Sequence, residues 1–69
     1  SFKNEMNQTP MEYLTDIRIE ESKVLLSTTN YSMSQIAAIV GFSTQAYFSK
    51  QFKQKIGMTP LAYRKSQLE

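Results

Sequence analysis

Residues 32–56 read Ser-Met-Ser-Gln-Ile-Ala-Ala-Ile-Val-Gly-Phe-Ser-Thr-Gln-Ala-Tyr-Phe-Ser-Lys-Gln-Phe-Lys-Gln-Lys-Ile, and this stretch decides the fold. Ser32 and Gln35 have the spacing of a capping box, in which each side chain bonds the other residue's backbone N–H, so a helix begins after Ser32. Apolar side chains within residues 36–40 supply a short buried stripe for this helix. Gly41 then interrupts the pattern, because glycine can take the positive φ that a sharp turn requires.

A second helix is expected after this break, over about residues 44–56. Ser43 is suited to its N-cap, because a serine hydroxyl accepts a hydrogen bond from the free N–H groups of a first turn. Phe48, Phe52 and Ile56 recur at intervals of four and form one narrow apolar face, and the glycine that follows them ends the helix. A short helix, a three-residue turn and a second amphipathic helix are the layout of a helix-turn-helix.

The longest helix is expected before this motif, from Thr9 to about Ser27. Thr9 is its N-cap, Pro10 suits the first helical position, and Glu12 completes another capping box. The Thr-Pro pair at residues 59–60 begins a last helix in the same way. The sequence therefore predicts an all-α fold: a small helical bundle built on a homeodomain-like helix-turn-helix and preceded by a long helix. The core stripe predicted for the long helix consists of its aliphatic residues Leu14, Ile17, Val24 and Leu25, with Leu26 beside them.

Two polar features of the long helix allow more than one interpretation. Glu12, Asp16 and Glu20 could form a carboxylate pair for acid–base chemistry, but intervals of four are typical of an ordinary solvated helix face, which is the favoured interpretation. Arg18 faces partly toward the predicted core stripe. We expect it to bond a carboxylate or a backbone carbonyl of the protein rather than DNA.

The composition excludes several classes of function. Sixty-nine residues are enough for one small domain, and the absence of cysteine and histidine excludes disulfides and any metal site or catalysis that uses those residues. No nucleophile–base pair, glycine-rich phosphate loop or metal cluster is visible. The longest apolar run, residues 36–40, is far shorter than the about 20 residues of a membrane span. We therefore expect no enzyme, cofactor, metal or membrane partner, and a chain without cysteine fits the cytoplasm.

The charge is distributed unevenly along the chain. Residues 1–35 carry three basic and five acidic side chains, whereas residues 36–69 carry five basic and one acidic side chain. The net charge of +2 therefore arises on and after the second helix of the helix-turn-helix. A basic surface there is what binding to a polyanion requires.

An internal repeat relates the two ends of the chain. Residues 2–13 match residues 52–63 at an offset of 50, with Phe, Lys, Thr, Pro and Tyr identical in both copies. In the second copy this pattern ends a helix-turn-helix and begins another helix. By symmetry, residues 1–8 are expected to be the tail of an earlier, truncated helix-turn-helix, and the chain a piece of a longer protein.

The second helix of the motif supplies the candidate functional residues, because its first turn normally enters the major groove of DNA. Gln45 can bond adenine at two positions, Lys50 can reach guanine O6 and N7 or a phosphate, and Ala46 can contact a thymine methyl group. A further set is suited to phosphate oxygens, which position a protein without specifying a sequence. These predicted phosphate contacts are Ser43, Thr44, Tyr47, Ser49 and Lys53.

The same residues resemble a known family. The pattern Ile-Ala-x-x-x-Gly-Phe-Ser-x-Gln-x-Tyr-Phe-Ser-Lys-x-Phe-Lys, followed by Gly-Met-Thr-Pro-x-x-Tyr-Arg, is similar to the C-terminal signature of AraC/XylS-type transcriptional regulators. The matching positions are Met33-Ser34, Ile36-Ala37, Gly41-Phe42-Ser43, Gln45, Tyr47-Phe48-Ser49-Lys50, Phe52-Lys53, Gly57-Met58-Thr59-Pro60 and Tyr63-Arg64.

The resemblance implies two helix-turn-helix units joined by a linker helix, each placing a recognition helix in the major groove. Residues 9–27 would be the linker helix and residues 32–69 the second unit with its C-terminal helix. The family's base contacts then fall again on Gln45, Ala46 and Lys50, the last of which is commonly arginine. Ser22 departs mildly from the alanine that is frequent in the linker. Homodimerisation would occur only through a domain absent from this chain.

Sequence-specific binding of double-stranded DNA in transcription regulation is therefore the favoured function. The alternative is a helical protein-interaction module that shares the helix-turn-helix shape without binding DNA. An exposed apolar patch in place of the basic face would mark that alternative.

Overall fold

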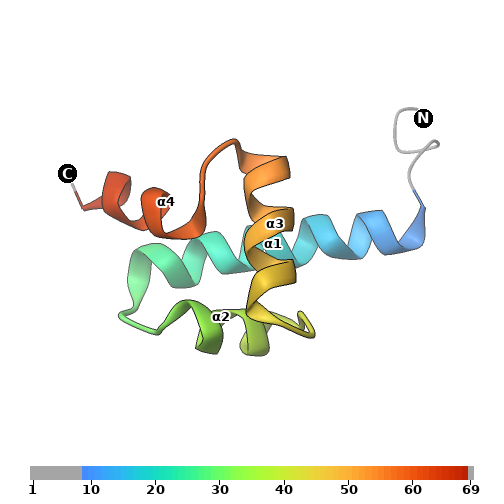
Figure 1. Cartoon of the computed structure of the whole chain (residues 1–69), viewed down its shortest axis with the longest axis horizontal. Helices are drawn as coiled ribbons and strands as arrows, with labels where there is room; N and C mark the ends of the chain where they lie inside the picture. The colour runs from blue at the N-terminus through green and yellow to red at the C-terminus, as the bar shows by residue number, and fades with distance from the viewer. Residues whose placement is uncertain (1–8, 69) are drawn as a thin grey trace.

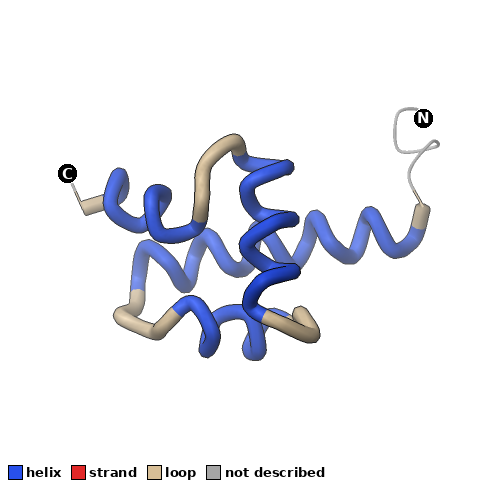
Figure 2. The backbone as a smooth tube through the Cα atoms, in the orientation of Figure 1, coloured by secondary structure: helices blue, strands red, loops and turns tan. Residues whose placement is uncertain are grey.

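Four helices make up the structure, which is a computed structural model that describes residues 9–68. They are α1 (Pro10–Thr28), α2 (Met33–Val40), α3 (Gln45–Ile56) and α4 (Pro60–Gln67), and the described residues contain no strand. Helix α1 runs along the length of the molecule, and α2, α3 and α4 pack against its C-terminal two thirds, with α3 crossing it steeply (Figures 1 and 2). The predicted all-α bundle built on a helix-turn-helix is confirmed. The tail expected at residues 1–8 lies outside the described residues.

The helix starts follow the predicted capping boxes. The backbone N–H of Thr9 donates to Glu12 Oε1 at 3.0 Å, and the N–H of Glu12 donates to Thr9 Oγ1 at 3.1 Å. Ser32 and Gln35 make the same reciprocal pair at the start of α2, at 2.9 and 3.0 Å. Each pair satisfies two N–H groups that have no partner inside the helix, so these short sequence signals determine where α1 and α2 begin.

The turn between α2 and α3 closes on Gly41, which has a φ of 106° as predicted. The N–H of Phe42 donates to the Ala37 carbonyl at 2.8 Å, which is the long bond of a Schellman motif. Ser43 is not the N-cap of α3, contrary to the prediction: Thr44 takes that position and accepts from the N–H of Tyr47 at 3.0 Å. Because Phe42 completes this C-terminal bond and is itself buried, the chain needs one more residue before α3 begins.

A row of aromatic rings connects three parts of the helix-turn-helix region. Phe48 and Phe52 are fully buried, as predicted from their spacing, and their ring centroids lie 5.8 Å apart. Phe42 from the turn contacts Phe48 at 5.3 Å, and Tyr63 of α4 contacts Phe52 at 5.6 Å. This row holds the turn, α3 and α4 in one core with the buried side chains of α1 and α2.

The buried face of α1 differs from the predicted stripe. Leu26 is buried and Leu25 partly buried, but Ile17 and Val24 are 38% and 59% exposed and lie on the side away from the core. The short side chains of Thr15 and Ser22 belong to the buried face. The Ser22 hydroxyl donates to the Ile19 carbonyl of its own helix at 2.6 Å. The residues that form the buried face are Thr15, Ile19, Ser22 and Leu26, and Leu14 is also exposed.

Ile17 and Ile19 offer a matched test of this face, because the same residue type is 38% exposed at one position and 1% exposed at the other. Ile19→Ala should lower the free energy of unfolding by about 2–5 kcal/mol, since it leaves a cavity in the core. Ile17→Ala should change it by less than about 1 kcal/mol. Urea unfolding followed by circular dichroism measures both; equal losses, or a larger loss for Ile17→Ala, would contradict the observed face.

Candidate nucleic-acid interface

The outer face of α3 carries the predicted base-contacting residues. Gln45, Ala46 and Lys50 are all exposed, in the first and second turns of the helix. Ala46 and Lys50 lie on the side of α3 opposite Phe48 and Phe52, whose burial fixes the rotation of the helix about its axis. Gln45 lies nearer the buried side by helical angle, yet it is exposed in the first turn. All three predicted side chains are therefore accessible at the N-terminal half of α3, Ala46 and Lys50 by helical spacing and Gln45 by its place in the first turn.

The predicted phosphate-contacting residues surround this surface. Four of them, Ser43, Thr44, Tyr47 and Lys53, are exposed, and Ser49 is partly buried. The Tyr47 ring packs edge-on against Phe42 at 5.7 Å while 45% of the residue remains exposed, so this side chain both packs and presents a surface.

The start of α3 also offers backbone donors. The N–H groups of Tyr47 and Phe48 are satisfied by Thr44, through its hydroxyl and its carbonyl respectively. Within the described chain, the N–H groups of residues 43–46 have no acceptor. Free N–H groups at a helix N-terminus attract anions, so the polar surface of α3 is bordered by donors suited to a phosphate.

The basic side chains divide into bonded and unbonded sets. Lys23 pairs with Glu20 at 3.2 Å, and Lys55 pairs with Asp16 of α1 at 2.8 Å. Lys55 therefore holds α3 to α1, which its position in the sequence did not reveal. Over residues 9–68, the cations without a salt bridge or a protein hydrogen bond are Arg18, Lys50, Lys53 and Lys65.

Arg18 differs from its expectation as a bonded structural residue. Over the described part of the chain its guanidinium makes no salt bridge or hydrogen bond, although the side chain is partly buried. It lies instead against the backbone of the turn: a Cβ placed on Gly41 would come within 2.9 Å of Arg18 Nε. Gly41 is thus needed for its positive φ, and the Arg18 guanidinium lies in the space beside it.

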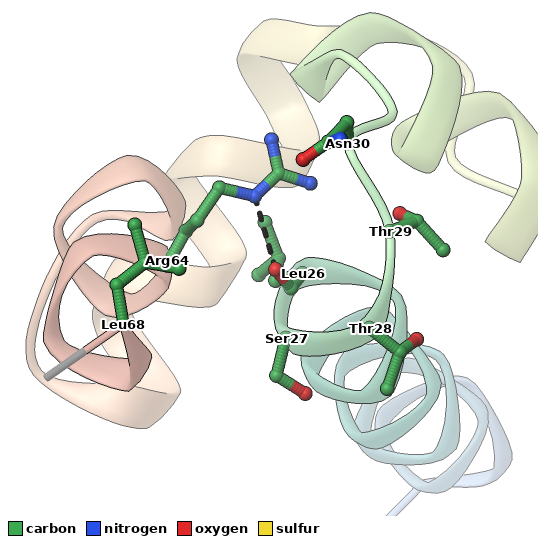
Figure 3. Close-up of a pocket in the computed structure, with 7 residues that line it drawn as sticks. All are labelled: Leu26, Ser27, Thr28, Thr29, Asn30, Arg64 and Leu68. Atoms are coloured by element: carbon green, nitrogen blue, oxygen red, sulfur yellow. Dashed lines mark hydrogen bonds between the residues drawn. The ribbon is translucent and has the colours of Figure 1, made fainter.

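Arg64 makes the contact that was expected of Arg18. Its Nε donates to the Leu26 carbonyl at 3.0 Å, at the C-terminal end of α1 (Figure 3). The last turn of α1 has no basic residue of its own, so Arg64 supplies the positive charge that a helix C-terminus favours. The contact joins α4 to α1, and no sequence signal pointed to it.

A cavity of about 210 Å³ adjoins Arg64, whose buried Nη2 has no partner within residues 9–68. The cavity lies between α4 and the end of α1, and its lining brings no nucleophile–base pair together. The described residues also contain no group of three acidic side chains that could hold a metal ion, and none of their helices meets the length and hydropathy of a membrane span. The lining residues are Leu26, Ser27, Thr28, Thr29, Asn30, Arg64 and Leu68.

Comparison with known proteins agrees with this geometry. The sequence model of a family described as a helix-turn-helix domain matches residues 1–66. The crystal structure of an AraC-type transcriptional regulator from Chromobacterium violaceum superposes with a TM-score of 0.89 at 28% identity, over 99% of this chain and 61% of that one. The chain belongs to the AraC/XylS family.

Two curated relatives are named as regulators of operons. The raffinose operon transcriptional regulatory protein of Pediococcus pentosaceus is 45% identical over 65 residues, which are 94% of this chain and 24% of that protein. The arabinose operon regulatory protein of Salmonella typhimurium is 35% identical over 63 residues, 91% of this chain and 22% of that protein. The chain thus spans only about a quarter of the length of these relatives. The family and the fold are those of DNA-binding regulators rather than enzymes.

Removal of the Arg64 contact should loosen α4. Arg64→Met should lower the free energy of unfolding by about 1.5–3 kcal/mol, because the Leu26 carbonyl loses a charged donor. For a domain of this size each kcal/mol corresponds to roughly 4–8 °C in Tm. Lys65→Met, at the adjacent exposed position, is the control and should stay within about 0.5 kcal/mol. Thermal unfolding measures the Tm of both variants. Equal Tm values would show that the Arg64 contact contributes nothing to stability.

Proposed function

We propose that this chain binds double-stranded DNA sequence-specifically, with α3 in the major groove. The observation that carries the proposal is the exposure of Gln45, Ala46 and Lys50 in the first two turns of a helix that Phe48 and Phe52 anchor in the core. A major groove admits one α-helix, and the first turns of a recognition helix are the part that meets base edges.

Each of the three side chains has a distinct task in this proposal. Gln45 forms two hydrogen bonds with the N6 and N7 positions of an adenine. Lys50 donates to guanine O6 and N7 or to a nearby phosphate; as a lysine it lacks the planar fork of an arginine, so its contact is less selective in geometry. Ala46 allows the backbone to approach closely and touches a thymine methyl group.

Phosphate contacts orient α3 in the groove. Lys53 supplies a charge that no acidic residue within the described chain neutralises. The hydroxyls of Ser43, Thr44, Tyr47 and Ser49 donate to phosphate oxygens, and the Thr44 hydroxyl can do so while it caps α3, because capping uses only its lone pair. These contacts raise the affinity for every duplex and select none.

The rest of the proposal concerns the longer protein. The repeat relates Tyr63, which packs on Phe52, to Tyr13, which is 61% exposed near the start of α1. A preceding helix-turn-helix unit would cover Tyr13 in the same way, and α1 would then be the linker between two units. Such a regulator would act on DNA in the cytoplasm without catalysis, and any homodimer would form through a further domain.

The interaction-module alternative receives less support from the same surface. It requires an apolar patch on α3, whereas the exposed side of α3 bears Lys50, Lys53 and Gln54. The exposed aliphatic side chains Ile17 and Val24 belong to α1 and not to α3.

The division of labour between base and phosphate contacts can be tested with two variants. Gln45→Ala should lower the preference for the best duplex over a scrambled one by about 1–3 kcal/mol, because it removes a bidentate base contact. Lys53→Ala should weaken binding to both duplexes by the same factor and should reduce the salt dependence by about one counterion. The best duplex is first selected from a random pool, and affinities are measured by fluorescence anisotropy at several salt concentrations.

Two results would contradict the proposal in different ways. Equal loss of discrimination from both variants would refute the assigned roles while leaving DNA binding intact. Selection that yields no preferred duplex, with binding that does not depend on salt, would refute sequence-specific DNA binding itself.

A further inference from the structure

Arg18 is the one arginine in residues 9–68 that the protein itself does not bond. The residue is partly buried, its guanidinium lies against Gly41, and no carboxylate, carbonyl or hydroxyl of the described chain accepts from the five N–H donors of that group. A charged group that has lost part of its hydration without gaining a partner is costly. Arg64, the other arginine, shows the usual solution, a hydrogen bond to a carbonyl.

The position of Arg18 connects it to the DNA-facing side of the fold. Its guanidinium rests on Gly41, at the beginning of the turn that leads into α3. The backbone N–H groups of residues 43–46, which begin two residues after Gly41, have no acceptor in the described chain. The turn therefore brings an unbonded guanidinium and a set of unbonded N–H donors into one short segment, and all of them can bind an anion.

Local acidic groups do not account for the arrangement. Glu21, three residues further along α1, forms no salt bridge with Arg18, and Asp16, two residues before it, is engaged with Lys55 on the α3 side. Glu20 is paired with Lys23. The charge of Arg18 is thus left for a group outside this chain.

We propose that Arg18 donates to a DNA phosphate beside the turn, so that α1 supplies a backbone contact in addition to those of α3. This inference rests on the proposed DNA binding and extends it to a helix that carries no recognition residue. The contact would fix the depth at which the turn approaches the duplex, because Arg18 packs directly on Gly41.

Arg18→Gln removes the charge and leaves a shorter side chain with two amide N–H donors in place of five, and it provides the first test. It should weaken binding to selected and scrambled duplexes alike by about tenfold, the equivalent of one charged hydrogen bond, and should lower the salt slope by about one. Arg18→Lys keeps the charge and should retain the slope of the wild type. Lys65→Gln, which removes an exposed and equally unbonded cation, is the matched control and should change the affinity less than about twofold. Equal effects of Arg18→Gln and Lys65→Gln would overturn the proposal.

A second measurement needs no variant. The chain has only two arginines, so the Nε–H resonances of Arg18 and Arg64 can be followed separately by NMR while a selected duplex is added. We expect the Arg18 resonance to shift and that of Arg64, already bonded to Leu26, to stay in place. If the backbone amides of residues 43–53 shift but Arg18 does not, this inference fails while DNA binding stands. If neither responds, the proposed function fails and this inference with it.

Discussion

The packing of Phe48 and Phe52 against α1 is the constraint on which the rest of the structure depends. Both rings are fully buried and in contact with each other, with Phe42 on one side and Tyr63 on the other. Both lie on one face of α3, so their burial fixes the rotation of α3 about its own axis. The polar side chains on the other face of the helix must then point outward. One apolar interaction thus sets the fold and the orientation of the candidate interface together.

Salt bridges and hydrogen bonds distinguish the basic residues that stabilise the fold from those that can still bind a phosphate. Lys55 and Lys53 are two residues apart on α3, yet the first is paired with Asp16 of α1 and the second has no acidic partner over residues 9–68. The two arginines differ in the same way. Arg64 is bonded at the C-terminus of α1, whereas Arg18 lies against the turn at Gly41 without a hydrogen bond or salt bridge in the described chain. A net charge of only +2 therefore understates the positive charge that a polyanion would meet near α3.

The sequence predicted those features that depend on local signals. Capping boxes at Thr9 and Ser32, and the positive φ of Gly41, depend on residues only a few positions apart, so they could be read directly. The outward face of α3 was also predictable, because its apolar residues occupy one narrow side. The shift of the N-cap from Ser43 to Thr44 was not, because it follows from the burial of Phe42.

The buried side of α1 shows where sequence reasoning stops. This helix has aliphatic residues on two sides, and hydrophobicity alone favoured the side of Ile17 and Val24. The core instead buries Ser22, a small residue whose hydroxyl is satisfied within α1. The choice of buried side, like the contact of Arg64 with Leu26, is made only when the helices are placed in space.

Cross-linking tests the central claim, that the outer face of α3 meets the major groove, most directly. The chain has no cysteine, so Ala46→Cys introduces a single thiol on that face, and Val24→Cys places one on the exposed side of α1 away from the core. A selected duplex carries a disulfide-activated tether on a base, in the major groove in one series and in the minor groove in the other. We expect Ala46→Cys to cross-link to the major-groove tether and Val24→Cys to neither. Equal cross-linking of both variants, or of Ala46→Cys to the minor-groove tether alone, would contradict the account.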